Sequence, residues 1–255
     1  MKLFVITTNT FREAIRNKVF YTLLFFAVLF AALAVSLSTM TLTKQTHIII
    51  DMGFLTVELF GTLIAIFVGI NLVYKELERR TIYTILTRPI RRYQFIVGKY
   101  LGLLLTLGVE VAFMSAIFFA IVSAFGEYHR LPALSLAVWL IFMKISLVTA
   151  VAVFFSSLSS SILSGMFTLA FYLIGSTSGY LRDLVSNSSP PFLGAMIRLI
   201  NFVLPDFRFL DIKGAVLYEK PVPFSQVADA TAYAAFYITL VLMIAILIFE
   251  RKDMK

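Results

Sequence analysis

Residues 53–74, GFLTVELFGTLIAIFVGINLVY, decide the fold class of this chain. The stretch is long enough to cross a hydrocarbon core of roughly 30 Å, which takes roughly 20 apolar residues in a helix. Because lipid offers no partner to exposed backbone amides, the stretch predicts a membrane-spanning helix. The composition agrees, since 60% of the 255 residues are hydrophobic and the mean hydropathy is +0.93. We therefore expect an all-α membrane protein.

Five further stretches have similar length and composition. The sequence thus predicts six spans, at residues 19–38, 53–74, 100–125, 133–155, 162–180 and 230–249. An even number places both termini on one side of the membrane. Fourteen of the 22 Lys and Arg residues lie in the amino-terminal segment, the loop after the second span and the tail. By the positive-inside rule, both termini are expected in the cytoplasm, with the chain in the inner (plasma) membrane.

The segments outside the spans differ in character. Residues 1–18 predict a helix in the cytoplasmic interface, with its Arg side chains near anionic lipid headgroups, although an extension of the first span fits the pattern too. Its apolar stripe consists of Phe4, Phe11 and Ile15. Residues 181–229 predict a long extracytoplasmic loop that acts as a lid or scaffold. We expect residues 1–255 to form a single transmembrane domain, and we assign the net charge of +8 to membrane orientation and not to nucleic-acid binding.

The cytoplasmic loop at residues 75–99 carries the clearest functional pattern. Helical spacing places Ile82, Ile85 and Leu86 on one face, and Thr84 elsewhere. Pro89 ends the helix because it lacks an amide hydrogen. Such an apolar ridge, framed by charge, fits a groove on a soluble partner. A loop whose basic residues serve only topology is the alternative.

The same loop resembles that of ABC-transporter permeases of the type-2 exporter class. The matching residues are Glu76, Glu78, Thr81, Ile82, Pro89, Arg92, Gly98 and Lys99. Similar segments occur at TFREAIRNKVFY (10–21), LPDFRFLDIKGAV (204–216) and FERKD (249–253), so the resemblance covers nearly the whole chain. Within the class, the chain is most similar to permeases associated with multicopper-enzyme maturation.

The resemblance implies an exporter permease that forms a homodimer, or a heterodimer with a similar permease, and binds two ABC ATPase subunits. The chain itself has no G-x-x-x-x-G-K-[ST] loop, so ATP and Mg are expected on the partner and no cofactor, metal or catalytic residue on this chain. The implied coupling helix contacts the ATPase through Glu76, Glu78, Arg79, Thr81, Ile82, Ile85, Leu86, Thr87, Arg88, Pro89 and Arg92.

Three ionisable residues lie within the predicted spans, where an unpaired charge is costly. Glu110 and Lys144 fall near mid-depth on consecutive spans, which predicts an ion pair that fixes helix packing or handles protons or substrate. Glu58 lies near the outer end of its span, where it snorkels or lines the outer mouth.

Small and polar residues line two of the predicted spans. They indicate either tight helix packing or a translocation and dimer face. They are Glu58, Thr62, Gly69, Gly165, Thr168, Tyr172, Gly175 and Gly179.

Two other function classes compete with an ATP-driven permease. An ion-coupled secondary carrier would use Glu110 and Lys144, but the halves of the sequence show no inverted repeat. A membrane-embedded enzyme would need clustered His, Cys or paired carboxylates, and the chain has no Cys and two His.

Overall fold

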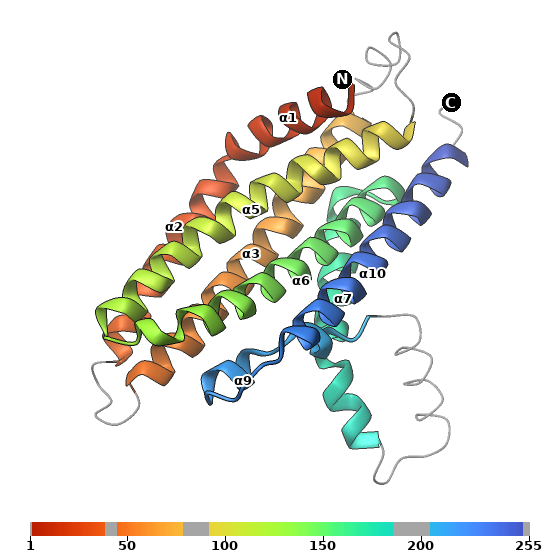
Figure 1. Cartoon of the computed structure of the whole chain (residues 1–255). Coiled ribbons are helices and arrows are strands. Elements are labelled where there is room, and N and C mark those ends of the chain that lie inside the picture. The colour runs from red at the N-terminus through yellow and green to blue at the C-terminus, as the bar shows by residue number, and fades with distance from the viewer. Residues whose placement is uncertain (1, 39–44, 79–91, 186–204, 252–255) are drawn as a thin grey trace.

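The computed structural model describes residues 2–38, 45–78, 92–185 and 205–251, and its regular structure there is helical (Figure 1). Five long helices contain windows long and apolar enough to cross a membrane. They are α2 (Lys18–Ser38), α3 (Gln45–Glu78), α5 (Arg92–Ala124), α6 (Leu131–Leu158) and α10 (Phe224–Arg251). These helices confirm the predicted all-α, multi-pass class.

The sixth predicted span, residues 162–180, corresponds to α7 (Ser161–Val185). The apolar part of α7, Ser161–Thr177, has 17 residues and is shorter than the other five windows. With 25 residues in all, α7 extends over roughly 37 Å, more than the thickness of a hydrocarbon core. The count of six spans therefore stays a prediction.

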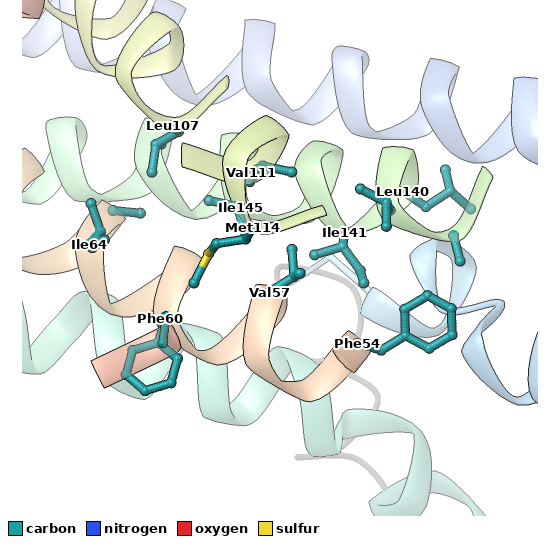
Figure 2. Packing of buried hydrophobic residues seen from close by; sticks show 14 of the residues in the cluster. Phe54, Val57, Phe60, Ile64, Leu107, Val111, Met114, Leu140, Ile141 and Ile145 are labelled. Carbon is teal, nitrogen blue, oxygen red and sulfur yellow. The ribbon is translucent and has the colours of Figure 1, made fainter. Parts of the chain in front are cut away.

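Helices α3 and α6 form the centre of the bundle. In their spanning windows 72% and 78% of the residues are buried, whereas the share is 17% in both α2 and α10. At Gly61 a Cβ atom would lie 2.5 Å from Cδ1 of Ile145, so glycine lets α3 and α6 approach closely. Figure 2 shows the core, in which Phe54, Val57, Phe60 and Ile64 of α3 pack with Leu107, Val111 and Met114 of α5 and with Leu140, Ile141 and Ile145 of α6.

The predicted amino-terminal helix exists as α1 (Lys2–Ile15), separated from α2 by a short break. The Asn17 side chain accepts a hydrogen bond from the Val19 amide at 3.0 Å and so caps α2. Phe4, on the predicted apolar stripe, faces outward, while Thr7, Thr10 and Ala14 are buried. Helix α1 lies along the start of α5, and the last turns of α10 lie at the same end of the bundle (Figure 1). Its place in a membrane interface stays a prediction.

Two glycines of α5 make room for α1. A Cβ at Gly102 would lie 2.5 Å from Cβ of Thr10 and 2.8 Å from the carbonyl oxygen of Thr7. At Gly98 the nearest atoms belong to Ile6, at 2.8 Å. The Lys99 side chain, 2% exposed, lies 3.9 Å from the Glu13 carboxylate of α1. Close backbone contact and charge together hold α1 on α5.

We expect Gly102→Ala to lower the free energy of unfolding by about 1–3 kcal/mol, because the new methyl overlaps the backbone of α1. Gly108→Ala is the matched control, since the atoms nearest to its Cβ are 3.9 Å away. That control is expected to be neutral or slightly stabilising, because alanine favours helix. The apparent melting temperature in detergent measures both variants. Equal effects of the two substitutions would contradict the close packing of α1.

Between α7 and α10 the chain folds back onto the bundle. This segment contains η2 (Phe207–Leu210) and α9 (Lys213–Leu217), and lies at the end of the bundle opposite the chain termini (Figure 1). It packs against α3, α6, α7 and α10. Helix α7 continues to Val185 and α10 begins at Phe224, so both ends of the predicted loop at 181–229 are helical, and its place outside the membrane stays a prediction.

Candidate functional site

A buried carboxylate joins four parts of the chain. Glu58 of α3 is 7% exposed and lies near the middle of the apolar window Gln45–Ile70. Its Oε1 accepts hydrogen bonds from Nζ of Lys144 on α6 at 2.6 Å and from the Tyr172 hydroxyl on α7 at 3.1 Å. Its Oε2 accepts a hydrogen bond from Nζ of Lys213 on α9. We call Glu58, Lys144, Tyr172 and Lys213 the Glu58 cluster.

Helix α3 begins at Gln45, before the predicted start of the span, and the depth of Glu58 in the membrane stays a prediction. The charge of Glu58 is compensated by two lysines instead of water. This compensation is what a charge within a membrane-spanning bundle requires.

Lys213 brings a second carboxylate to the cluster. Its Nζ lies 3.5 Å from Oδ2 of Asp211. Partial burial lowers the pKa of Lys213, but the charges of Glu58 and Asp211 raise it, and the net effect is a pKa above the ordinary value. Lys213 therefore carries a positive charge at neutral pH.

Aromatic rings complete the surroundings of Lys144. Its Nζ lies 5.3 Å from the ring centroid of Tyr172 and 5.1 Å from that of Phe207, distances typical of cation–π contacts. Phe207, in η2, is 1% exposed and fills a space next to Gly175 of α7. A Cβ atom at Gly175 would lie 2.7 Å from that ring, so the glycine admits the phenylalanine.

The predicted ion pair between Glu110 and Lys144 is wrong. Lys144 binds Glu58, and Glu110 of α5 is fully buried with neither carboxylate oxygen in a hydrogen bond to any residue that the structure describes. Although Glu110 and Lys144 lie at similar depth on consecutive helices, their side chains do not face each other. Helix α3 packs against α6 as well, and it supplies the carboxylate.

We expect Glu110→Gln to change the free energy of unfolding by less than about 1 kcal/mol, because no cation loses its counter-ion. Glu58→Gln is the matched comparison and should cost several times more. Apparent melting temperatures of the two variants in the same detergent measure the difference. If Glu110→Gln were the more destabilising variant, Glu110 would have a charged partner.

The polar residues that were predicted to form one translocation and dimer face separate in the structure. Thr62 is 2% exposed, and the atoms nearest to a Cβ at Gly69 belong to Leu103 and Ala152 of α5 and α6. Both residues thus lie inside the bundle. On α7, Thr168 and Gly175 are buried. Gly179 belongs to α7, but its surroundings lie outside the described side chains.

Gly165 lies instead in an apolar groove between α3 and α7. The groove has a volume of about 370 Å³. Its lining consists of Leu63, Ile66, Phe67, Ile70, Ser161, Ile162, Gly165, Met166 and Leu169.

Most of the predicted coupling helix lies outside the described residues. This holds for Arg79, Thr81, Ile82, Ile85, Leu86, Thr87, Arg88 and Pro89. Glu76 and Glu78 belong to the last turns of α3, and Arg92 is the first residue of α5. The backbone of α3 therefore enters the predicted loop as one continuous helix.

Sequence reasoning missed three residues that hold the segment after α7. Lys213 belongs to the Glu58 cluster, and Phe207 contacts it through Lys144. The buried Arg130 donates hydrogen bonds to the carbonyl oxygens of Val216 and Leu217 at 3.1 and 2.8 Å. Charges in long loops carry little weight in a topology argument, so Lys213, in the predicted loop at 181–229, received no role. The sequence feature that could have indicated burial of Lys213 is its position within the mostly apolar run LDIKGAV at residues 210–216.

Comparison with known proteins gives one family. The family model described as ABC-2 family transporter protein matches residues 4–254. A comparison with curated proteins gives no match.

Proposed function

Because the chain belongs to the ABC-2 transporter family, we propose that it is the permease subunit of an ATP-driven exporter, working as a dimer with two ATPase subunits. The family consists of membrane components whose partners are ABC ATPases. In this proposal residues 1–255 form one permease domain, ATP and Mg bind to the partner, and the chain converts ATP-driven movement into substrate passage. The resemblance to permeases associated with multicopper-enzyme maturation does not identify the substrate that the protein transports.

Continuous helices flanking residues 79–91 carry the proposal that this loop is the coupling element. Helix α3 has 34 residues and a length of roughly 50 Å, whereas the hydrocarbon core is roughly 30 Å thick. Its apolar window ends at Ile70, so the residues up to Glu78 continue as helix beyond that window. Displacement at Glu78 would therefore reach the Glu58 cluster through a single helix.

The start of α5 is braced in the same region. Lys99 faces Glu13 of α1, and Gly98 and Gly102 hold α1 at close range. A force on the loop would thus act on α3 on one side and on the α1–α5 pair on the other. This arrangement favours transmission over local bending.

The groove between α3 and α7 is the surface that we propose for the second permease copy. It is apolar, it faces outward, and it includes Gly165, which allows close approach of another helix. Thr62 and Gly69 are excluded from this surface because they pack within the subunit.

The chain's orientation follows from its basic residues. Helix α1 and the end of α10 lie at the same end of the bundle as the end of α3 and the start of α5, which flank residues 79–91 in the sequence (Figure 1). With the positive-inside rule, this side is the cytoplasm, and the segment with η2 and α9 is extracytoplasmic.

The secondary-carrier interpretation has lost its basis. It required Glu110 and Lys144 to act together, and Lys144 is bound to Glu58. The Glu110–Lys144 pair on which this interpretation rested is therefore not formed in the part of the chain that the structure describes.

Purification of the tagged chain from its native membrane tests the proposed function. We expect a co-purifying protein with a G-x-x-x-x-G-K-[ST] loop, together with ATP hydrolysis that is lost when the chain is purified away from it. A chain that purifies without any such protein, or that hydrolyses ATP by itself, would overturn the proposal.

A further inference from the structure

The segment from Asp206 to Lys213 is held to the bundle by buried apolar side chains, by a hydrogen bond from the Asp206 amide to the Tyr233 hydroxyl of α10 at 2.9 Å, and by the contact of Lys213 with Glu58. Phe207, Leu210 and Ile212 are buried, but η2 has four residues and α9 has five. Such short elements have few internal hydrogen bonds, and segments of this kind open locally more easily than long packed helices. Their attachment depends on what they contact in the bundle.

The two carboxylate oxygens of Glu58 have partners in different parts of the structure, one in the bundle and the other in this segment. Oε1 accepts hydrogen bonds from Lys144 and Tyr172, which belong to the long helices α6 and α7, whereas Oε2 accepts one from Lys213. If Lys213 leaves, Glu58 keeps its ion pair with Lys144 and its hydrogen bond from Tyr172. Breaking a buried ion pair is costly mainly because it leaves a buried charge without a partner, and here none is left.

The Lys213 side chain is also close to solvent. It is 26% exposed, and Asp211, its second carboxylate, belongs to the same segment and would move with it. The Lys144 side chain, by contrast, is 6% exposed and belongs to the long central helix α6, which does not move with the segment. Of the two lysines on Glu58, Lys213 is the one that can separate.

The other end of the segment is fixed more firmly. Arg130, at the start of α6, is 5% exposed and donates to the carbonyl oxygens of Val216 and Leu217, at the end of α9. Its Nη1 also lies 3.5 Å from the Glu219 carboxylate. Removing this guanidinium from the carbonyls would leave a buried charge with unsatisfied donors.

We infer that residues 206–213 form a detachable plug at the end of the bundle opposite α1, with the Lys213–Glu58 contact as its latch and the Arg130–α9 contact as its hinge. The inference concerns the isolated chain and does not depend on the proposed function. In the open state Lys213 is in water, Glu58 remains paired with Lys144, and α9 remains attached at Val216.

Cysteine labelling tests the plug, because the natural chain contains no cysteine. Three single-cysteine reporters are made from buried residues, Leu210→Cys in the plug, Val216→Cys at the hinge and Val153→Cys in α6. Each is combined with Lys213→Gln, and a hydrophilic maleimide reports the rate of opening in detergent. Lys220→Gln is the matched control, since Lys220 is exposed and lies in the same loop.

We expect Lys213→Gln to speed labelling at residue 210 by about tenfold over the same reporter alone, the factor that a lost charge-assisted hydrogen bond corresponds to. Labelling at residues 216 and 153 should stay within twofold, and Lys220→Gln should change none of the three. An unchanged rate at residue 210 would overturn the latch. A parallel increase at residue 216 would overturn the hinge, and an increase at residue 153 would show general loosening in place of a detachable plug.

Discussion

Replacing Glu58 by leucine is expected to lower the free energy of unfolding by about 3–5 kcal/mol, because Lys144 is left buried without a carboxylate. The Lys144 side chain is 6% exposed and keeps only its contacts with the Tyr172 and Phe207 rings. For a chain of this size the loss corresponds to an apparent melting temperature roughly 10 °C lower. Thermal unfolding in detergent, followed by the fraction that stays monodisperse, measures the change.

Two further variants separate the charge effect from a packing effect. The double variant Glu58→Leu with Lys144→Met removes both charges and should recover most of the lost stability, since a buried pair is replaced by apolar side chains. Asp51→Asn, on the same helix but exposed, should be neutral. A double variant as unstable as Glu58→Leu would contradict the assignment of Lys144 to Glu58.

The second large effect is expected at the predicted coupling loop. Ile85→Asp places a charge in the middle of the predicted apolar ridge. If the ridge fills a groove on the ATPase, the substitution should weaken binding of the ATPase subunit by about 30-fold or more, as at a central interface residue. Co-purification at defined ATPase concentrations measures the loss. The melting temperature of the chain alone should stay unchanged.

Thr84→Asp is the matched control for this prediction. It adds the same charge to the same loop, on the face away from Ile82, Ile85 and Leu86. Binding of the ATPase should fall by less than threefold, since charge at the rim of an interface changes affinity little. Equal losses in both variants would mean that charge in the loop matters and that an apolar ridge does not.

Hydropathy predicted the helices well because membrane spans follow from local composition. The predicted stretches at 19–38 and 133–155 lie in α2 and α6 with similar ends, whereas α5 and α10 begin at Arg92 and Phe224, earlier than the predicted stretches at 100–125 and 230–249. Helix ends were less accurate where polar residues continue a helix, as at the start of α3, where residues 45–52 include His47 and Asp51. The earlier start of α3 places Glu58 further from the end of its helix than the predicted span did.

Which helix faces which could not be predicted from spacing. Glu110 and Lys144 match in depth, but the partner of Lys144 comes from α3, because Gly61 lets α3 and α6 approach closely. The role of Lys213 depends on the chain folding back after α7, a long-range contact without a local signal. The loop pattern at residues 75–99, in contrast, led directly to the family that the whole-chain comparison confirmed.

Site-specific cross-linking tests most directly whether residues 75–99 receive force from an ATPase. In the cysteine-free chain, an Ile85→Cys variant is labelled with a maleimide photocross-linker and irradiated in its native membrane. A Tyr128→Cys variant, exposed at the opposite end of the bundle, serves as the control. We predict a covalent product of the chain with an ABC ATPase from position 85 and none from position 128. Cross-linking of the ATPase at position 128, or its absence at position 85 in a complex that contains the ATPase, would contradict the account.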